Sequence, residues 1–282
     1  MAKVAGLLYY PVKGGAAVST EAATVMPAGL AHDRSFLVVS EQGVFRTQRR
    51  DPRLALIAPD VSADGEYLTL RTEDYGSVRV DVDTTGPRQD IDLFGTRYQG
   101  IDQGTPAAEW LSDVLGAGSR LVRVPPEHHR ITDGRTPGTS GYADSCAVHL
   151  ISRASLDLLN GKLVARGAQA LPMPRFRPNI VVDGWDEPHT EDRAFRIRIG
   201  DAELAYAKLA IRCAVVMVNQ ETAAKAGPEP LRTLATYRRA AEGGVAFGAK
   251  YAVLQPGEIS IGDAVNVTRW EPSELQGRSG QP

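Results

Sequence analysis

Short apolar and β-branched runs, separated by turn-forming residues at close intervals, fill the first hundred positions. Strands are predicted at residues 4–10, 35–39, 54–57, 67–72, 78–82 and 98–101. Glycine-rich turns such as Lys13-Gly14-Gly15 come between them. Helical periodicity is nearly absent before residue 105. The pattern predicts a small antiparallel sheet or barrel in this part of the chain.

Two later segments show helical spacing. Thr105-Pro106 is predicted to open the first helix, since proline is favoured at the first helical position. Its inner face is predicted to hold Ala107, Trp110, Leu111, Val114 and Leu115. Ser152 is the predicted N-cap of a second helix that runs to about residue 166. The inner face of that helix is predicted to hold Leu156, Leu159, Leu163 and Val164.

The remaining chain returns to strands, which predicts a mainly β fold with a few helices (α+β). Further strands are expected at residues 120–124, 179–182, 195–199, 203–218, 251–254 and 264–267, and a polar loop at 127–141. We expect an N-terminal β-rich domain over residues 1–104 and a second domain with a β-barrel-like sheet over 105–270. A disordered tail is expected over 271–282. No linker composition separates the domains, so they are expected to pack together.

Composition excludes several classes of protein. The 282 residues carry a formal net charge of −2, so the overall charge of the protein does not favour binding to nucleic acid or to an anionic membrane. No apolar run reaches the roughly 18 residues of a membrane-spanning helix, and no signal peptide precedes the first strand, which predicts a cytoplasmic protein. The two cysteines, Cys146 and Cys213, are too few for an iron–sulfur cluster, which typically needs four thiolates.

Cys213 is the central candidate for chemistry, because it follows a long apolar run and has Arg212 beside it. A neighbouring cation favours the thiolate that metals require. The alternative is a small buried hydrophobe, which is the commoner role of a lone cysteine. In a strand, moreover, neighbouring side chains point to opposite faces, so Arg212 could face solvent while Cys213 is buried.

Three loops carry further candidate groups. Residues 175–179 place two arginines and an asparagine around a proline, a set that suits a phosphate or a solvated loop. Residues 11–15 and the pair Asp33-Arg34 add cations next to strands. Residues 142–146 offer a hydroxyl, a carboxylate and a thiol, or simply a hydrogen-bonded turn. The adjacent His128 and His129 lack the spacing of a metal site.

Taken in order, several short segments resemble the MOSC proteins that carry an N-terminal MOSC β-barrel domain, as in the amidoxime-reducing component family. These segments are residues 10–13, 33–34, 142–144, 176–179, 212–213, 230–238 and 247–248. The resemblance covers about residues 3–268. It implies a molybdenum cofactor, which is a molybdopterin whose dithiolene sulfurs hold the metal, with a protein cysteine as a further ligand.

The resemblance also assigns residues to this site. Cys213 would ligate molybdenum and act in catalysis, together with Asn219, which stands where many members have aspartate. The residues implied in cofactor binding are Lys13, Gly14, Arg34, Asp144, Ser145, Cys146, Arg177, Asn179 and Arg212. A soft thiolate suits molybdenum, and cations from several loops suit an anionic cofactor.

The resemblance implies an oxidoreductase that reduces N-hydroxylated small molecules. Because two cysteines cannot hold a cluster, the electrons would come from a separate ferredoxin, flavoprotein or cytochrome. The alternative is a non-catalytic cofactor carrier or a sulfur-transfer module that uses Cys213. Three departures from the family pattern, at Val216, Met217 and Asn219, favour this alternative. At Gly14, where serine is common in the family, one side-chain contact is lost.

Overall fold

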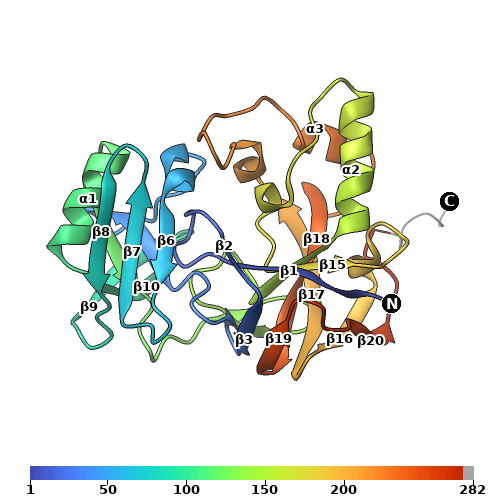
Figure 1. Cartoon of the computed structure of the whole chain (residues 1–282), viewed down its shortest axis with the longest axis horizontal. Helices are drawn as coiled ribbons and strands as arrows, with labels where there is room; N and C mark the ends of the chain where they lie inside the picture. The colour runs from blue at the N-terminus through green and yellow to red at the C-terminus, as the bar shows by residue number, and fades with distance from the viewer. Residues whose placement is uncertain (276–282) are drawn as a thin grey trace.

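An eight-stranded sheet forms the centre of the larger of two lobes in the computed structural model, which describes residues 1–275 (Figure 1). The strand order is β2-β1-β15-β14-β18-β17-β16-β20. The strands span Val18–Thr20, Lys3–Tyr9, Ile180–Asp183, Val148–Ser152, Val245–Gln255, Ala202–Arg212, Ala194–Ile199 and Asn266–Trp270, in the same order. Neighbours pair antiparallel except β14 and β15, which are parallel.

The smaller lobe contains two sheets, one α-helix and the 3₁₀ helix η1 (Figure 1). One sheet has the order β5-β11-β10-β9, with bounds Phe36–Ser40, Ser119–Arg123, Thr96–Asp102 and Arg88–Leu93. The other is the meander β6 (Ala58–Val61), β7 (Tyr67–Thr72) and β8 (Gly76–Asp81). Helix α1 (Thr105–Leu115) packs on these strands with Ala107, Leu111 and Val114 buried. The predicted inner face of this helix is therefore confirmed for these residues.

Further helices and two small sheets complete the fold. Helix α2 (Arg153–Ala165) begins after Ser152, whose hydroxyl accepts a hydrogen bond from the backbone N–H of Ser155. Helix α3 spans Leu231–Leu234. The 3₁₀ helices are η1 (Pro52–Leu56), η2 (Met173–Phe176), η3 (Thr190–Asp192) and η4 (Ala214–Met217). Two small sheets are β19-β3-β4 (Gly257–Ser260, Ala22–Met26, Gly29–Leu30) and β12-β13 (Ile131–Thr132, Gly138–Thr139).

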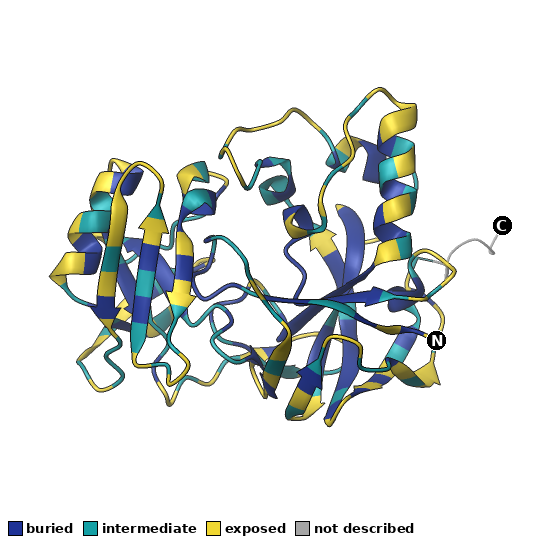
Figure 2. Cartoon of the chain, in the orientation of Figure 1, coloured by how far each residue is buried: buried dark blue, intermediate teal, exposed yellow. Residues whose placement is uncertain are grey.

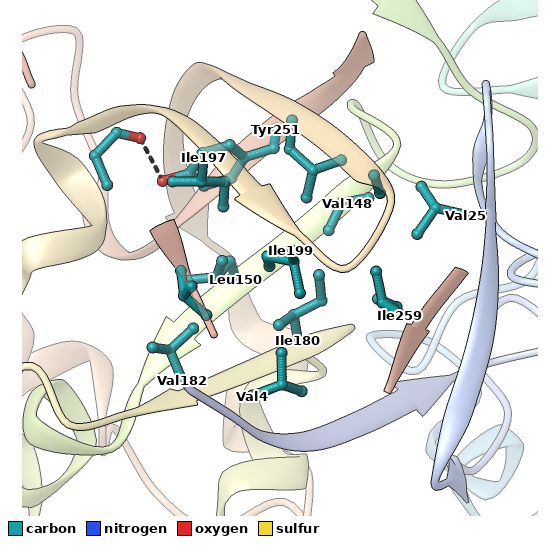
Figure 3. Packing of buried hydrophobic residues seen from close by; sticks show 14 of the residues in the cluster. Val4, Val25, Val148, Leu150, Ile180, Val182, Ile197, Ile199, Tyr251 and Ile259 are labelled. Carbon is teal, nitrogen blue, oxygen red and sulfur yellow. Dashed lines mark hydrogen bonds between the residues drawn. The ribbon is translucent and has the colours of Figure 1, made fainter. Parts of the chain in front are cut away.

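Each lobe has its own hydrophobic core. In the larger lobe the apolar faces of β1, β14, β15, β16 and β18 pack together around residues such as Val4, Leu150 and Ile197 (Figure 3). The hydroxyl oxygen of Tyr251 lies 2.9 Å from the carbonyl oxygens of both Glu191 and Ala194, so its one hydrogen is shared between these two acceptors. The buried strand centres and the exposed rims are visible in Figure 2.

Strands make up 41% of the chain and helices 16%, which confirms the predicted mainly β class with few helices. The two lobes do not divide the chain at residue 104 as expected: a segment before this residue belongs to the larger lobe, and a segment after it belongs to the smaller lobe. Strand β1 pairs with β15 and β2 in the large sheet, whereas α1 packs against β8, β11 and η1 of the smaller lobe. Of the expected tail 271–282, residues 276–282 lie outside the described residues, and Ser273 is buried.

Four local predictions were wrong. Residues 54–57 are largely the 3₁₀ helix η1, because Pro52 fixes a helical start that the apolar run does not reveal. Strand β17 ends at Arg212 rather than at residue 218. The expected loop 127–141 contains the strands β12 and β13. The side chain of Val164 is 59% exposed, because it lies one position beyond the buried Leu163 on α2.

The predicted β-barrel is not closed among residues 1–275. Its outer strands, β2 and β20, are not neighbours. One edge of β1 pairs with β15, and residues 7–9 of its other edge pair with β2. The start of β1 contacts residues 262–265, just before β20, through backbone hydrogen bonds such as Val4 N–H to the carbonyl oxygen of Asp263 at 2.9 Å. None of the helices in the described range is long and apolar enough to cross a membrane.

Candidate functional site

A cavity of about 340 Å³ is lined by residues of both lobes. Its wall brings together ten residues that were predicted from the sequence: Lys13, Gly14, Arg34, Asp144, Ser145, Cys146, Arg177, Asn179, Arg212 and Cys213. These residues come from loops and strand ends that are up to 200 positions apart in the chain. The cavity is therefore the candidate site.

Cys213 occupies the junction between β17 and η4. The strand ends at Arg212, and the backbone turns into the 3₁₀ helix directly after the cysteine. The two side chains therefore do not alternate between the faces of a strand, and both line the cavity. The thiol of Cys213 is free and partly exposed. Its position on the cavity wall favours a chemical role over the alternative of a buried hydrophobic residue.

His149 orients Arg212 through a fixed tautomer. Nη1 of Arg212 lies 3.4 Å from Nε2 of His149, and Nδ1 of His149 lies 3.2 Å from the carbonyl oxygen of Arg177. Because the guanidinium only donates, Nε2 accepts and Nδ1–H donates to the carbonyl. Burial, aided by the charges of Arg212 and Lys250, holds the pKa of His149 well below its ordinary value. The imidazole is therefore neutral at physiological pH.

Arg34 and Arg177 lie on Tyr10, with their guanidinium carbons 4.3 and 4.1 Å from its ring centroid. Nη1 of Arg34 pairs with the carboxylate of Asp33 at 2.6 Å and donates to Oδ1 of Asn179 at 3.2 Å. Both arginines have positive φ, 49° and 55°, an uncommon conformation for residues other than glycine. Burial lowers the pKa of Arg177 to about 10. Backbone strain of this kind costs free energy and is frequent at functional sites.

Lys13 forms an ion pair with Asp144 on the same wall. Enclosure would raise the pKa of Asp144, but the charges of Lys13 and Lys250 overcome this effect and hold it well below its ordinary value. Burial lowers the pKa of Lys250 to about 8, with Arg212 adding to the shift and Asp144 opposing it. The carboxylate is thus ionised, and Lys250 titrates close to physiological pH.

Positive charge dominates the cavity. Eight lysine and arginine side chains line it, against three carboxylates. Nη2 of Arg177 and Nε of Arg212 are buried and have no hydrogen-bond partner among the described residues. Unsatisfied buried donors of this kind are costly unless a ligand or water accepts from them. The wall therefore suits an anionic ligand that carries several acceptor oxygens.

Asn219 is the one predicted site residue that does not line the cavity. Its carboxamide oxygen accepts hydrogen bonds from the backbone N–H groups of Glu221 and Thr222, at 2.8 and 3.3 Å. It therefore closes a turn in the loop after η4. The catalytic role assigned to it from the resemblance stays a prediction, and the geometry gives it a structural role.

Several lining residues were missed at the sequence level. His149 and Lys250 each interrupt an apolar strand, β14 and β18, and a polar residue in a buried run was the available signal. The smaller lobe adds a segment, residues 45–49, and Phe94. These positions carried no local signal, because only the packing of the two lobes brings them to the cavity.

The sequence of this chain matches two protein-family models and is similar to several known proteins. A model of the MOSC N-terminal beta barrel domain matches residues 1–118, and a model of the MOSC domain matches residues 137–266. Mitochondrial amidoxime-reducing component 1 of Mus musculus is 34% identical over 284 residues, which cover 93% of this chain and 81% of that protein. The human protein of the same name is 32% identical, with coverages of 93% and 82%.

A molybdenum cofactor sulfurase of Danio rerio is 31% identical over 265 residues, which cover 87% of this chain and 31% of the sulfurase. Among solved structures, the YUAD protein from Bacillus subtilis covers 94% of this chain at 12% identity, with a TM-score of 0.40. That structural similarity is too low to support a conclusion.

Proposed function

The chain belongs to the MOSC proteins with an N-terminal MOSC β-barrel domain, the family of the amidoxime-reducing components, and we propose that it is a molybdenum-cofactor-dependent oxidoreductase. Its substrates would be small N-hydroxylated compounds such as amidoximes and hydroxylamines. The observation that carries the proposal is the position of Cys213 on the wall of a cavity rich in lysine and arginine.

The residues present fit a phosphate-bearing cofactor with a metal. Lys13, Arg34 and Arg177 would hold its anionic end, where Nη2 of Arg177 is buried without a hydrogen-bond partner among residues 1–275. Guanidinium groups bind phosphate oxygens in a planar, bidentate manner. Cys213 would supply a soft thiolate ligand for molybdenum. Lys250, which the sequence alone did not single out, would add charge to the same wall.

The reaction consumes two electrons and two protons. The N–O bond of the substrate breaks, the nitrogen keeps its bond to carbon as an amine or amidine, and the oxygen leaves as water. When bound, the cofactor would supply the two-electron chemistry, and the protein would supply position and charge. The electrons would come from a separate ferredoxin, flavoprotein or cytochrome, because two cysteines cannot hold a four-thiolate cluster.

The residues around Cys213 would order the site before substrate arrives. Neutral His149 accepts from Arg212 and donates to the carbonyl of Arg177, so one imidazole links the guanidinium of Arg212 to the backbone of Arg177. Nη2 of Arg212 donates to the carbonyl oxygen of Phe176 at 2.8 Å, which holds its side chain against the wall. A site held in this way loses little entropy on binding.

A sulfur-transfer or carrier function is the second candidate. It is supported by the similarity to a molybdenum cofactor sulfurase and by Asn219, whose carboxamide closes a turn. In this case Cys213 would carry sulfur, or the cavity would carry the cofactor, to another protein. The expected cytoplasmic location stays a prediction, and the relatives cited above are named as mitochondrial.

Reduction of benzamidoxime tests the proposal. The protein is purified with molybdenum bound, reduced with dithionite or a reduced ferredoxin, and incubated with benzamidoxime. We expect benzamidine with wild type and none with Cys213→Ala. Absence of product from fully metal-loaded wild type contradicts the reductase proposal. Labile sulfur on Cys213 without retained molybdenum would support sulfur transfer instead.

A further inference from the structure

Two phenylalanines of the smaller lobe line the cavity and contact each other edge to face. The ring centroids of Phe45 and Phe94 are 4.6 Å apart, with an interplanar angle of 60°. Phe94 is 44% exposed, so it does not fill a hydrophobic core. An exposed aromatic side chain on a cavity wall is the kind of group that binds ligands rather than stabilises the fold.

The backbone at Phe94 is unusual for this residue type. Phe94 and Gly95 form the two-residue turn between β9 and β10, with φ of 59° and 79°. Positive φ at both central positions defines a type I′ turn, which favours asparagine followed by glycine. A bulky residue in the left-handed region is an outlier that costs free energy. The turn therefore holds a phenylalanine where asparagine would be less strained.

The pair borders the cationic part of the site. Nζ of Lys13 lies 5.0 Å from the ring centroid of Phe94, and the same ammonium pairs with Asp144. The rest of this edge comes from the smaller lobe as well, from residues 46–49. The larger lobe supplies Cys213, so the cysteine and the aromatic pair line one cavity.

We propose that the exposed ring of Phe94, supported by Phe45, forms an aromatic contact (the aromatic clamp) that selects flat aromatic or heteroaromatic N-hydroxylated substrates over aliphatic ones. The clamp rests on the proposed function. Aromatic rings attract one another in edge-to-face and offset arrangements beyond the area that they bury. The tilted pair leaves part of the Phe94 ring exposed for such a contact. An aliphatic amidoxime of similar polarity gains nothing from these rings.

The test compares benzamidoxime with acetamidoxime as substrates of the molybdenum-loaded protein. The variant is Phe94→Asn, because asparagine suits the type I′ turn and should preserve folding. We expect the KM for benzamidoxime to rise about tenfold, as the loss of aromatic contacts predicts, with kcat unchanged. The KM for acetamidoxime should change less than about twofold. Tyr75→Ala is the control, since Tyr75 is 43% exposed in another turn of this lobe and does not line the cavity.

Equilibrium binding of benzamidine and the molybdenum content provide readouts without turnover. We expect Phe94→Asn to weaken benzamidine binding about tenfold and to retain molybdenum at the wild-type level. Equal KM changes for both substrates, unchanged benzamidine binding, or loss of molybdenum in Phe94→Asn would each overturn the clamp. If loaded wild type reduces neither amidoxime, the proposed function fails, and benzamidine binding alone decides whether the clamp exists.

Discussion

Gln48 and Gln220 exchange a reciprocal pair of amide hydrogen bonds, each 3.0 Å long, across 172 positions of sequence. Nε2 of Gln48 also donates to the carbonyl oxygen of Gly14 at 2.7 Å. Oε1 of Gln220 accepts from Nη1 of Arg177 at 3.3 Å. One network thus joins the smaller lobe, the loop after Cys213 and a cation of the cavity, so the two lobes position the site together.

Removal of this link should weaken both the fold and the site. Gln48→Ala removes the hydrogen-bond partner of the Gln220 amide. Gln48 is only 1% exposed, so water does not readily take its place. We expect the free energy of unfolding to fall by about 1–3 kcal/mol. Molybdenum retention should fall as well, because Arg177 loses support. Urea denaturation and metal analysis measure the two effects. Gln42→Ala, at an exposed position, is the control and should leave both unchanged.

Replacing each cysteine in turn should distinguish a metal ligand, Cys213, from a cysteine that is buried, Cys146. Cys213→Ala removes the proposed metal ligand from a partly exposed position, so we expect loss of activity and of bound molybdenum with little change in Tm. Cys146 is buried, and its sulfur lies 3.8 Å from the carbonyl oxygen of Asp133. Cys146→Ser should retain most of the molybdenum. Equal metal loss in the two variants would contradict the assignment of Cys213 as the ligand.

The lowered pKa of Lys250 should make the stability of the cofactor-free protein depend on pH. Its pKa falls from 10.5 to about 8 on folding, mainly through burial. Below pH 8 the lysine is charged in both states, and its burial destabilises the fold. Between pH 8 and 10.5 only the unfolded chain keeps the proton, so stability rises with pH.

Lys250→Met should therefore be more stable than wild type at pH 7, and this difference should shrink as the pH rises towards 10.5. Urea denaturation at several pH values measures it, with the exposed Lys225→Met as control. A difference that stays constant with pH would show that Lys250 is not desolvated. In the cofactor-loaded protein we expect Lys250 to be favourable, because its positive charge then has an anionic partner. Lys250→Met should therefore retain less molybdenum than wild type.

Arg177 should not tolerate lysine. Its guanidinium donates to the carbonyl oxygen of Gly15 at 2.6 Å and lies over Tyr10, and its Nη2 has no hydrogen-bond partner in the described part of the chain. An ammonium cannot make these contacts at once. We expect Arg177→Lys to lower cofactor affinity about tenfold or more, measured as molybdenum retained through gel filtration. Arg166→Lys, at an exposed position after α2, should retain metal as wild type does.

The sequence by itself determined the mainly β class, the helix that starts at Thr105, the N-cap at Ser152 and ten of the residues that line the cavity. The first three follow from local patterns of apolar residues and capping groups, and the last from the resemblance carried by short motifs. Local patterns suffice for these features because helix periodicity and capping depend on residues within a few positions of each other.

Only the tertiary structure decided how these motifs meet. Strand β17 ends at Arg212 because the chain turns into η4, and this turn places Arg212 and Cys213 on one wall. The cavity's second side comes from Gln48 and Phe94, which reach it only through the packing of the smaller lobe. Contacts between residues more than a hundred positions apart depend on the packing of whole sheets, which no local pattern encodes.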